Sequence, residues 1–113
     1  MTRAEVWSCV VDEDGLVFVR APAGMSEGMR LAVETLVVPF GGSAVAVEEY
    51  LRAWRRAEEE FGERYVLGAT SAQVRRLGTD EVELGDMYGQ FEDCHMSVRE
   101  FERVLRQLVD FLR

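Results

Sequence analysis

Residues 96–113 read MSVREFERVLRQLVDFLR, and this stretch decides the fold. Ser97 followed by Glu100 predicts a capping box, in which the hydroxyl and the carboxylate accept the first backbone N–H groups of a helix. The apolar residues then recur at helical spacing: Val98, Phe101, Val104, Leu105, Leu108, Phe111 and Leu112. Such a stripe must be buried against a sheet or another helix. We therefore expect a closing helix near 98–112, packed on the rest of the chain.

A second helix is predicted near 44–61, with Ser43 as N-cap and Gly62 as terminator. The preceding Gly41-Gly42 matches no phosphate-binding fingerprint, so we interpret it as a chain reversal. The predicted buried residues of the two helices are Leu51, Trp54, Phe101, Leu105 and Leu108, and Trp7 is expected to join them. On the exposed side we expect three i,i+4 ion pairs: Glu48–Arg52, Arg55–Glu59 and Arg56–Glu60.

The remaining apolar runs predict strands. Residues 5–11 and 16–21, joined by Asp12-Glu13-Asp14-Gly15, favour a β-hairpin, because Asp-Gly supplies the positive φ of a tight turn. The near-continuous apolar run 30–40 predicts a third strand that is central or covered on both faces. Further strands are expected at 65–69, 73–77 and 81–84, with 88–96 extended, although 72–77 also fits a helical turn. The order β-β-β-α-β-β-(β)-α predicts one α+β domain over 1–113, an antiparallel sheet with two helices packed on one face.

The composition, 48% apolar and 30% charged, is typical of a globular protein. No apolar run approaches the roughly 18 residues of a membrane span, and no signal peptide is evident at the N-terminus, so we expect a cytoplasmic protein. All thirteen basic residues are Arg, and Lys, Ile and Asn are absent. That bias indicates a high-GC bacterial source, such as an actinobacterium or its phage. Cys9 and Cys94 lack C-x-x-C spacing and are expected to be buried thiols without a disulfide.

Residues 80–93 are acidic and contain no Arg. Strand alternation turns Glu81 and Glu83 outward, with Val82 and Leu84 inward. A bulge at Gly85 would bring the following alternate residues onto the same outer face. The simplest interpretation is a solvated sheet face. An aromatic residue within a patch of one charge sign also fits an electrostatically steered protein interface. The candidate partner-binding residues are Asp80, Glu81, Glu83, Asp86, Tyr88, Gln90, Glu92 and Asp93.

The formal net charge of −8 disfavours binding to nucleic acid or to anionic membranes, and it fits either a basic protein partner or simple solubility. His95 is the only histidine. Cys94 and His95 are neighbours in an extended segment and point to opposite faces, so they are poorly placed to share a metal ion. Zinc-ligand spacing is missing, and a Cys9–His95 nucleophile pair has no supporting motif. We predict no metal, no cofactor and no catalytic residues, and hence a non-enzymatic binding protein.

The layout resembles the small acidic immunity proteins of bacterial polymorphic-toxin and contact-dependent inhibition systems. The likeness lies in the leading hairpin, the helix, the acidic region (Asp80-Glu81-Val82-Glu83 and Tyr88-Gly89-Gln90-Phe91-Glu92-Asp93) and the capped closing helix. It implies a cytoplasmic protein that binds and blocks a basic toxin, often a nuclease. The alternatives are an acidic adaptor or secretion chaperone that dimerises through a helix or edge strand, a phage DNA mimic that inhibits a host defence enzyme, and an enzyme. The sequence leaves open whether the protein is a monomer or a homodimer.

Overall fold

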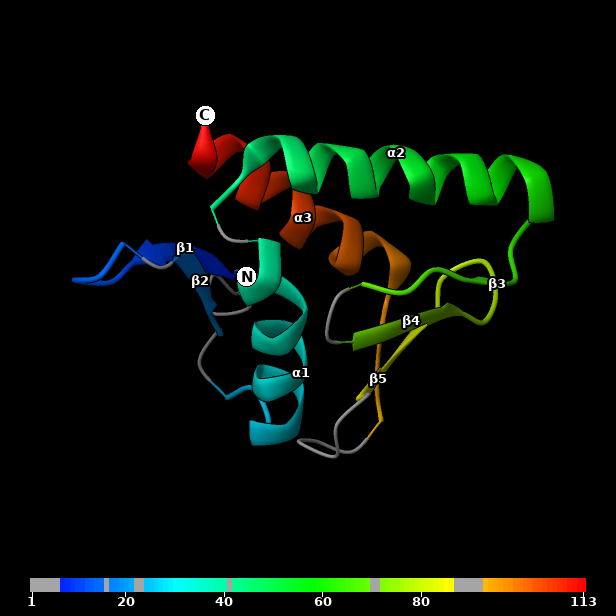
Figure 1. Cartoon of the computed structure of the whole chain (residues 1–113). Helices are drawn as coiled ribbons and strands as arrows, with labels where there is room; N and C mark the ends of the chain where they lie inside the picture. The colour runs from blue at the N-terminus through cyan, green and yellow to red at the C-terminus, as the bar shows by residue number, and fades with distance from the viewer. Residues whose placement is uncertain (1–6, 16, 22–23, 41, 70–71, 87–92) are drawn as a thin grey trace.

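The structure, a computed structural model, describes residues 7–15, 17–21, 24–40, 42–69, 72–86 and 93–113. It is an α+β fold in which helices pack against antiparallel sheets, which confirms the predicted fold class (Figure 1). In chain order the elements are β1 (Ser8–Val11), β2 (Val17–Arg20), α1 (Glu27–Val37), the 3-10 helix η1 (Val38–Phe40), α2 (Ala44–Phe61), β3 (Tyr65–Val66), β4 (Ala72–Arg76), β5 (Val82–Asp86), β6 (Cys94–Met96) and α3 (Val98–Leu112).

The strands form two separate sheets. β1 and β2 make the predicted hairpin, with Cys9 opposite Val19 and with Gly15 in the turn at a φ of 84°. The larger sheet has the order β3-β4-β5-β6, and each neighbouring pair is antiparallel. The segment 72–77, for which a helical turn was the alternative, contains strand β4. The single predicted sheet is therefore wrong, because the hairpin does not join the other four strands.

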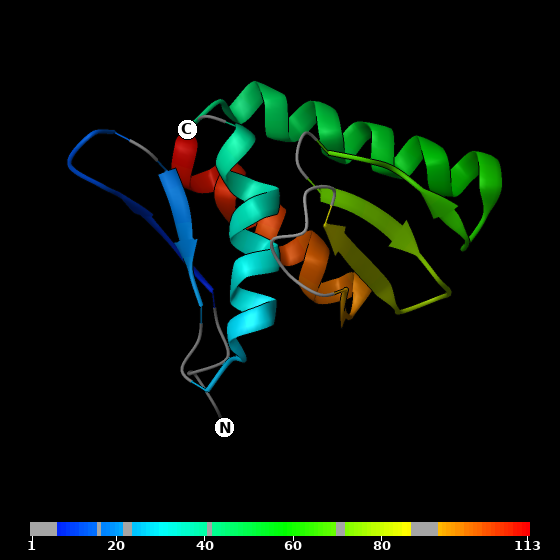
Figure 2. The same cartoon turned by 60° about the horizontal axis from the view of Figure 1, so that its bottom comes forward.

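The third strand predicted over residues 30–40 is also wrong, since this segment belongs to α1 and η1. Ser26 caps α1, and its hydroxyl accepts a hydrogen bond from the Met29 N–H at 3.2 Å. The buried positions follow helical spacing: Ala32, Val33, Leu36 and Val37. The run reads as continuously apolar because α1 lies between the hairpin and the larger sheet and contacts both (Figure 2).

The two predicted long helices are confirmed as α2 and α3, each capped by the expected serine. The Ser97 hydroxyl accepts from the Glu100 N–H at 2.9 Å, which is the first half of the predicted capping box. The Glu100 carboxylate accepts the indole N–H of Trp7 at 3.0 Å, and so it ties the hairpin to the start of α3. The Trp54 indole likewise donates to Glu102 at 2.9 Å, which links α2 to α3.

Two details of the helix surfaces differ from prediction. In α3 the buried stripe includes Val109, which is 6% exposed, whereas Phe111 is 43% exposed. Among the described residues, Glu48 pairs with Arg113 of α3, and no ion pair joins the three predicted partners along α2, namely Glu48–Arg52, Arg55–Glu59 and Arg56–Glu60. For Glu48, a contact with the end of α3 therefore replaces the predicted pairing along α2.

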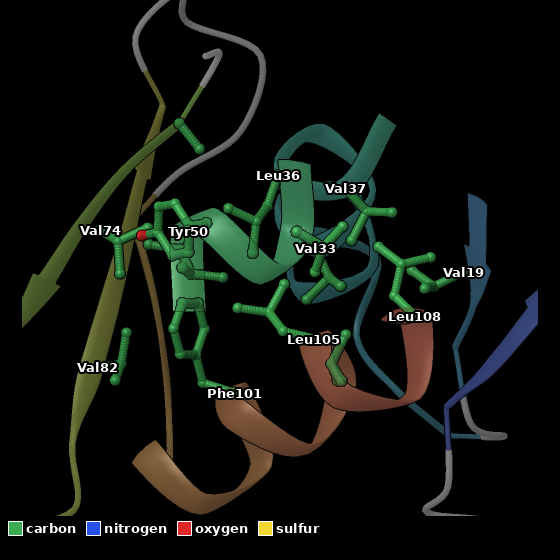
Figure 3. Close-up of a cluster of buried hydrophobic side chains, with 14 of the residues drawn as sticks. Val19, Val33, Leu36, Val37, Tyr50, Val74, Val82, Phe101, Leu105 and Leu108 are labelled. Carbon is green, nitrogen blue, oxygen red and sulfur yellow. The ribbon is translucent and has the colours of Figure 1, made fainter. Parts of the chain in front are cut away.

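The hydrophobic core runs without a break from the larger sheet to the hairpin. Figure 3 shows Val74 and Val82 of the sheet on one side and Val19 of the hairpin on the other, with side chains of the three α-helices between them. The predicted buried residues are confirmed at 7% exposure or less: Leu51, Trp54, Phe101, Leu105 and Leu108. Trp7 is also buried. Burial raises the pKa of Tyr50, whose hydroxyl stays protonated and donates to the Leu67 carbonyl at 2.8 Å.

One charged residue lies within this packing. Arg76 is 5% exposed, because alternation along β4 turns it to the buried face. Its guanidinium donates to the carbonyls of Gly78 and Thr79 at 3.0 and 3.1 Å, to the Tyr65 hydroxyl at 3.2 Å, and pairs with Glu58 at 3.0 Å. Burial alone would lower the pKa of Arg76. The hydrogen bonds to Tyr65 and Glu58 more than offset this effect, so the net pKa is raised and the group stays charged. Arg76 thus fastens the β4–β5 turn to α2.

A helix can cross a membrane only if it is both long and apolar. Within the described residues no single helix meets both conditions, and the one pair that meets them together, Glu27–Phe40 with Ala44–Phe61, is bent by 114°.

Candidate functional site

The four-stranded sheet has one buried and one exposed face. Along β4 the side chains alternate strictly, with Gln73 and Arg75 exposed. On β5 the side chains of Val82 and Leu84 are completely buried, as predicted, and Glu83 points to the opposite side. We call this opposite side the outer face. Among the described residues it carries Val66, Gln73, Arg75, Glu81, Glu83, Asp93 and His95.

A row of side chains crosses the outer face from strand to strand. The register places Val66, Arg75, Glu83 and His95 opposite one another on β3, β4, β5 and β6. Glu83 lies between two nitrogen groups: Arg75 Nη1 lies 3.3 Å from one carboxylate oxygen and His95 Nε2 lies 3.1 Å from the other. The patch read from the sequence as free of Arg is therefore of mixed charge in space, because β4 brings Arg75 beside β5. Sequence reasoning missed this neighbour.

His95 joins the outer face between two carboxylates, which sequence reasoning also missed. Its Nδ1 lies 2.6 Å from Glu81 and its Nε2 lies 3.1 Å from Glu83. An imidazole can donate from both nitrogens only when it is protonated. The hydrogen bond to Glu83 raises the pKa of His95, slight burial opposes this, and Glu81 raises it further, so the net direction is upward. Cys94 is half-buried on the other side of β6, as predicted for adjacent strand residues.

The remaining predicted site residues fall in three groups. Asp80 lies beside the first turn of α3. Its carboxylate oxygen is 3.5 Å from the backbone nitrogen of Arg99, and its carbonyl accepts a hydrogen bond from the Val98 N–H. The bulge predicted at Gly85 is wrong, because β5 pairs with β4 without interruption up to Asp86 opposite Ala72. The register shift that was expected to bring Asp86 onto the outer face is therefore absent. Tyr88, Gln90 and Glu92 lie outside the described residues.

Asp93 closes a small polar hollow on the outer face. The hollow has a volume of about 80 Å³ and is lined by Gln73, Arg75, Glu83, Gly85 and Asp93. The Asp93 carboxylate lies over Gly85, where a Cβ would come within 3.4 Å of its oxygen. A side chain at this glycine would press on that carboxylate. The hollow is large enough for a water molecule or a single charged group, and far smaller than the roughly 300 Å³ at which small-molecule pockets begin.

The described residues offer little chemistry beyond ionic and hydrogen-bond contacts. No group of three or more His, Cys, Asp or Glu side chains in the described ranges is placed to hold a metal ion. Neither Cys9 nor Cys94 forms a disulfide within the part of the chain that the structure covers. Burial raises the pKa of the Cys9 thiol, which reduces its thiolate fraction and hence its reactivity. The outer face, which gathers the ionic contacts of the four-stranded sheet, is the candidate site.

Comparison of this chain with protein-family models, with curated proteins and with solved structures found no match.

Proposed function

We propose that the protein is a non-enzymatic binding protein of the immunity type, which binds a basic protein toxin through the outer face of the four-stranded sheet. The observation that supports this proposal is the presence of three carboxylates, Glu81, Glu83 and Asp93, on one exposed sheet face of a chain with net charge −8. The net charge would attract a basic partner over long range, and the carboxylates would orient it at contact.

The contacts already made on this face suggest how a partner would bind. Glu81 and His95 are each about half exposed, at 52% and 49%, so their ion pair is worth little, roughly 0–1 kcal/mol. A guanidinium or ammonium group of the partner can replace the imidazole at small cost. In a nuclease-type toxin, the groups that the carboxylates engage would be the cations that bind the phosphates of its substrate, so binding would block the active groove.

A growth assay tests the immunity role directly. The reading frame next to the gene for this chain is expressed alone and together with it in a heterologous bacterium. We expect the neighbour to arrest growth and co-expression to restore it. A harmless neighbour, or arrest that co-expression leaves unchanged, would contradict the immunity role.

A charge-matched comparison tests the outer face. Glu81→Gln, Glu83→Gln and Asp93→Asn together make the net charge three units less negative. A control triple, Glu13→Gln, Glu59→Gln and Glu60→Gln, makes the same change at exposed positions elsewhere. We expect the first triple to slow association with the toxin by about tenfold and the control to change it about twofold or less, measured by surface plasmon resonance at low and high salt. Equal effects would show that only net charge matters.

Tyr88 stays a predicted anchor, since it lies outside the described residues. Tyr88→Ala should mainly speed dissociation, at a cost of about 2 kcal/mol if the ring is a hot spot. The same sensorgrams measure this, with Tyr88→Phe as the control that keeps the ring. An unchanged dissociation rate in Tyr88→Ala would remove Tyr88 from the site.

A further inference from the structure

A second hollow lies between α2 and α3, and its lining differs in charge from the rest of the protein. It has a volume of about 340 Å³. Each helix contributes one stripe at helical spacing, and the two stripes face each other: Glu48, Leu51, Arg52 and Arg55 from α2, and Arg106, Val109, Asp110 and Arg113 from α3. The C-terminal end of α3 lies beside the first half of α2, away from the four-stranded sheet (Figures 1 and 2). This hollow is therefore separate from the outer face.

Arginine is the most frequent residue in the lining of this hollow, which we call the groove. Four of its eight lining residues are Arg and two are acidic, which gives a local charge of +2 in a chain of net charge −8. Arg113 pairs with Glu48 across the groove, and Arg106 pairs with Glu102 at 3.4 Å on its own helix. Arg52 and Arg55 join no ion pair among the described residues. The floor, Leu51 and Val109, is 7% and 6% exposed. Two guanidinium groups without an ionic partner thus stand beside an apolar floor.

The spacing of the arginines indicates what the groove would hold. Arg106 and Arg113 are seven residues apart on α3, which is about 10 Å along a helix. A single phosphate or carboxylate would therefore occupy only part of the groove. Carboxylates on alternate residues of an extended peptide are about 6.7 Å apart, so two of them fit within this length beside the guanidinium groups. A nucleic-acid backbone fits less well, because its dense phosphates would meet the surrounding negative charge.

We infer that the groove between α2 and α3 binds an extended acidic peptide segment of another protein. The guanidinium groups of Arg52 and Arg55 would hold its carboxylates, and an apolar side chain of the peptide would rest on Leu51 and Val109. This site does not depend on the proposed function of the outer face. If both hold, the protein carries two surfaces of opposite charge and can contact a basic partner and an acidic segment at the same time.

The test uses a fluorescein-labelled peptide of six residues that alternates Glu and Val, with a Gln and Val peptide carrying the same label as the probe without side-chain carboxylates. Binding is followed by fluorescence anisotropy at low and high salt. We expect the acidic peptide to bind more tightly at low salt and the Gln and Val peptide to bind far more weakly. The double variant Arg52→Gln, Arg55→Gln should weaken binding about tenfold. The control Arg56→Gln, Arg103→Gln removes the same charge from exposed positions of the same helices outside the groove, and should change binding less than twofold.

Three results would overturn the inference. The first is equal loss of peptide binding in the two double variants, which would mean attraction without a site. The second is competition by inorganic phosphate as strong as that by unlabelled peptide, which would assign the groove to a single small anion. The third is a salt-sensitive dimer in sedimentation that Arg52→Gln, Arg55→Gln abolishes, which would place a second copy of this chain in the groove. Circular dichroism spectra and melting temperatures of the variants are compared with those of the wild type, to show that the substitutions leave the fold intact.

Discussion

Replacing Arg76 with methionine tests whether the buried guanidinium fastens the β4–β5 turn to α2. The change keeps an unbranched side chain of similar length and removes four polar contacts. The Tyr65 hydroxyl loses this donor inside the packing, at a cost of about 1–3 kcal/mol. The Gly78 and Thr79 carbonyls lie at a turn that water can reach. Glu58 is 46% exposed, so its ion pair adds about 1 kcal/mol at most. Relief from desolvation of the guanidinium offsets part of this, and we expect a net loss of about 2–3 kcal/mol.

Urea unfolding followed by circular dichroism and Trp fluorescence measures this loss. Arg75→Met is the matched control, because Arg75 immediately precedes Arg76, faces solvent and is 51% exposed. It should cost less than about 1 kcal/mol. A double-mutant cycle of Arg76→Met with Glu58→Gln should give a coupling below about 1 kcal/mol. The reasoning is refuted if Arg76→Met stays within about 0.5 kcal/mol of the wild type, the range of ordinary surface changes. It is also refuted if Glu58→Gln alone costs as much, because the ion pair would then outweigh the buried hydrogen bonds.

Three further predictions concern stability and the thiols. Leu105 is completely buried, so Leu105→Ala should lower the free energy of unfolding by about 2–5 kcal/mol in urea titrations; a loss below 1 kcal/mol would contradict its place in the core. The pKa of His95 is raised in the folded state, so its stabilising effect is fully present below its unfolded pKa of about 6.5 and is lost as the pH rises through the folded pKa. The stability gap between wild type and His95→Gln should therefore be larger at pH 5.5 than at pH 8.5, and a gap independent of pH would contradict the geometry. Mass spectrometry after thiol labelling of the native, reduced protein should show slower labelling of Cys9 than of the unfolded chain, because Cys9 is partly buried and its thiol pKa is raised; equal rates would contradict this.

The two long helices could be predicted to the residue because their signals are local. In each helix a capping serine and an apolar stripe at helical spacing lie within one segment, and α2 also ends at a glycine, Gly62. Helix α1 carried the same kinds of signal, with Ser26 as its cap and Arg30 paired with Glu34 one turn later at 2.8 Å. The near-continuous run of apolar residues over 30–40 outweighed these helix signals and led to the prediction of a strand. A helix packed between two sheets is apolar on most sides, and periodicity alone does not separate it from a buried strand. The length of the run, 11 residues, was the remaining signal that favoured a helix.

The outer face was predicted only in part, because its composition depends on strand pairing. Alternation within β5 placed Glu83 correctly, since alternation is a property of one strand. Arg75 and His95 reach Glu83 from the two neighbouring strands, and that contact depends on the register between separate strands. The prediction of an Arg-free patch counted neighbours along the chain and not across the sheet. The buried position of Arg76 was open to prediction, because it has the same strand parity as Ala72 and Val74, which face the core.

The carboxylates of the outer face differ in their exposure and in the partners that they already have. Glu83 is 20% exposed and lies between Arg75 and the titratable His95, so much of its charge is already engaged within the sheet. Glu81 is 52% exposed and has only the titratable His95 as its partner. A basic partner therefore gains more from Glu81 than from Glu83, because the imidazole is displaced more easily than a flanking arginine and histidine together. The same reasoning gives the direction of a pH effect on binding. As the pH rises and His95 loses its proton, the outer face becomes more negative while the edge strand β6 loses an ionic contact. If the outer face binds a basic partner as proposed, we expect tighter binding at higher pH, together with a less stable sheet edge.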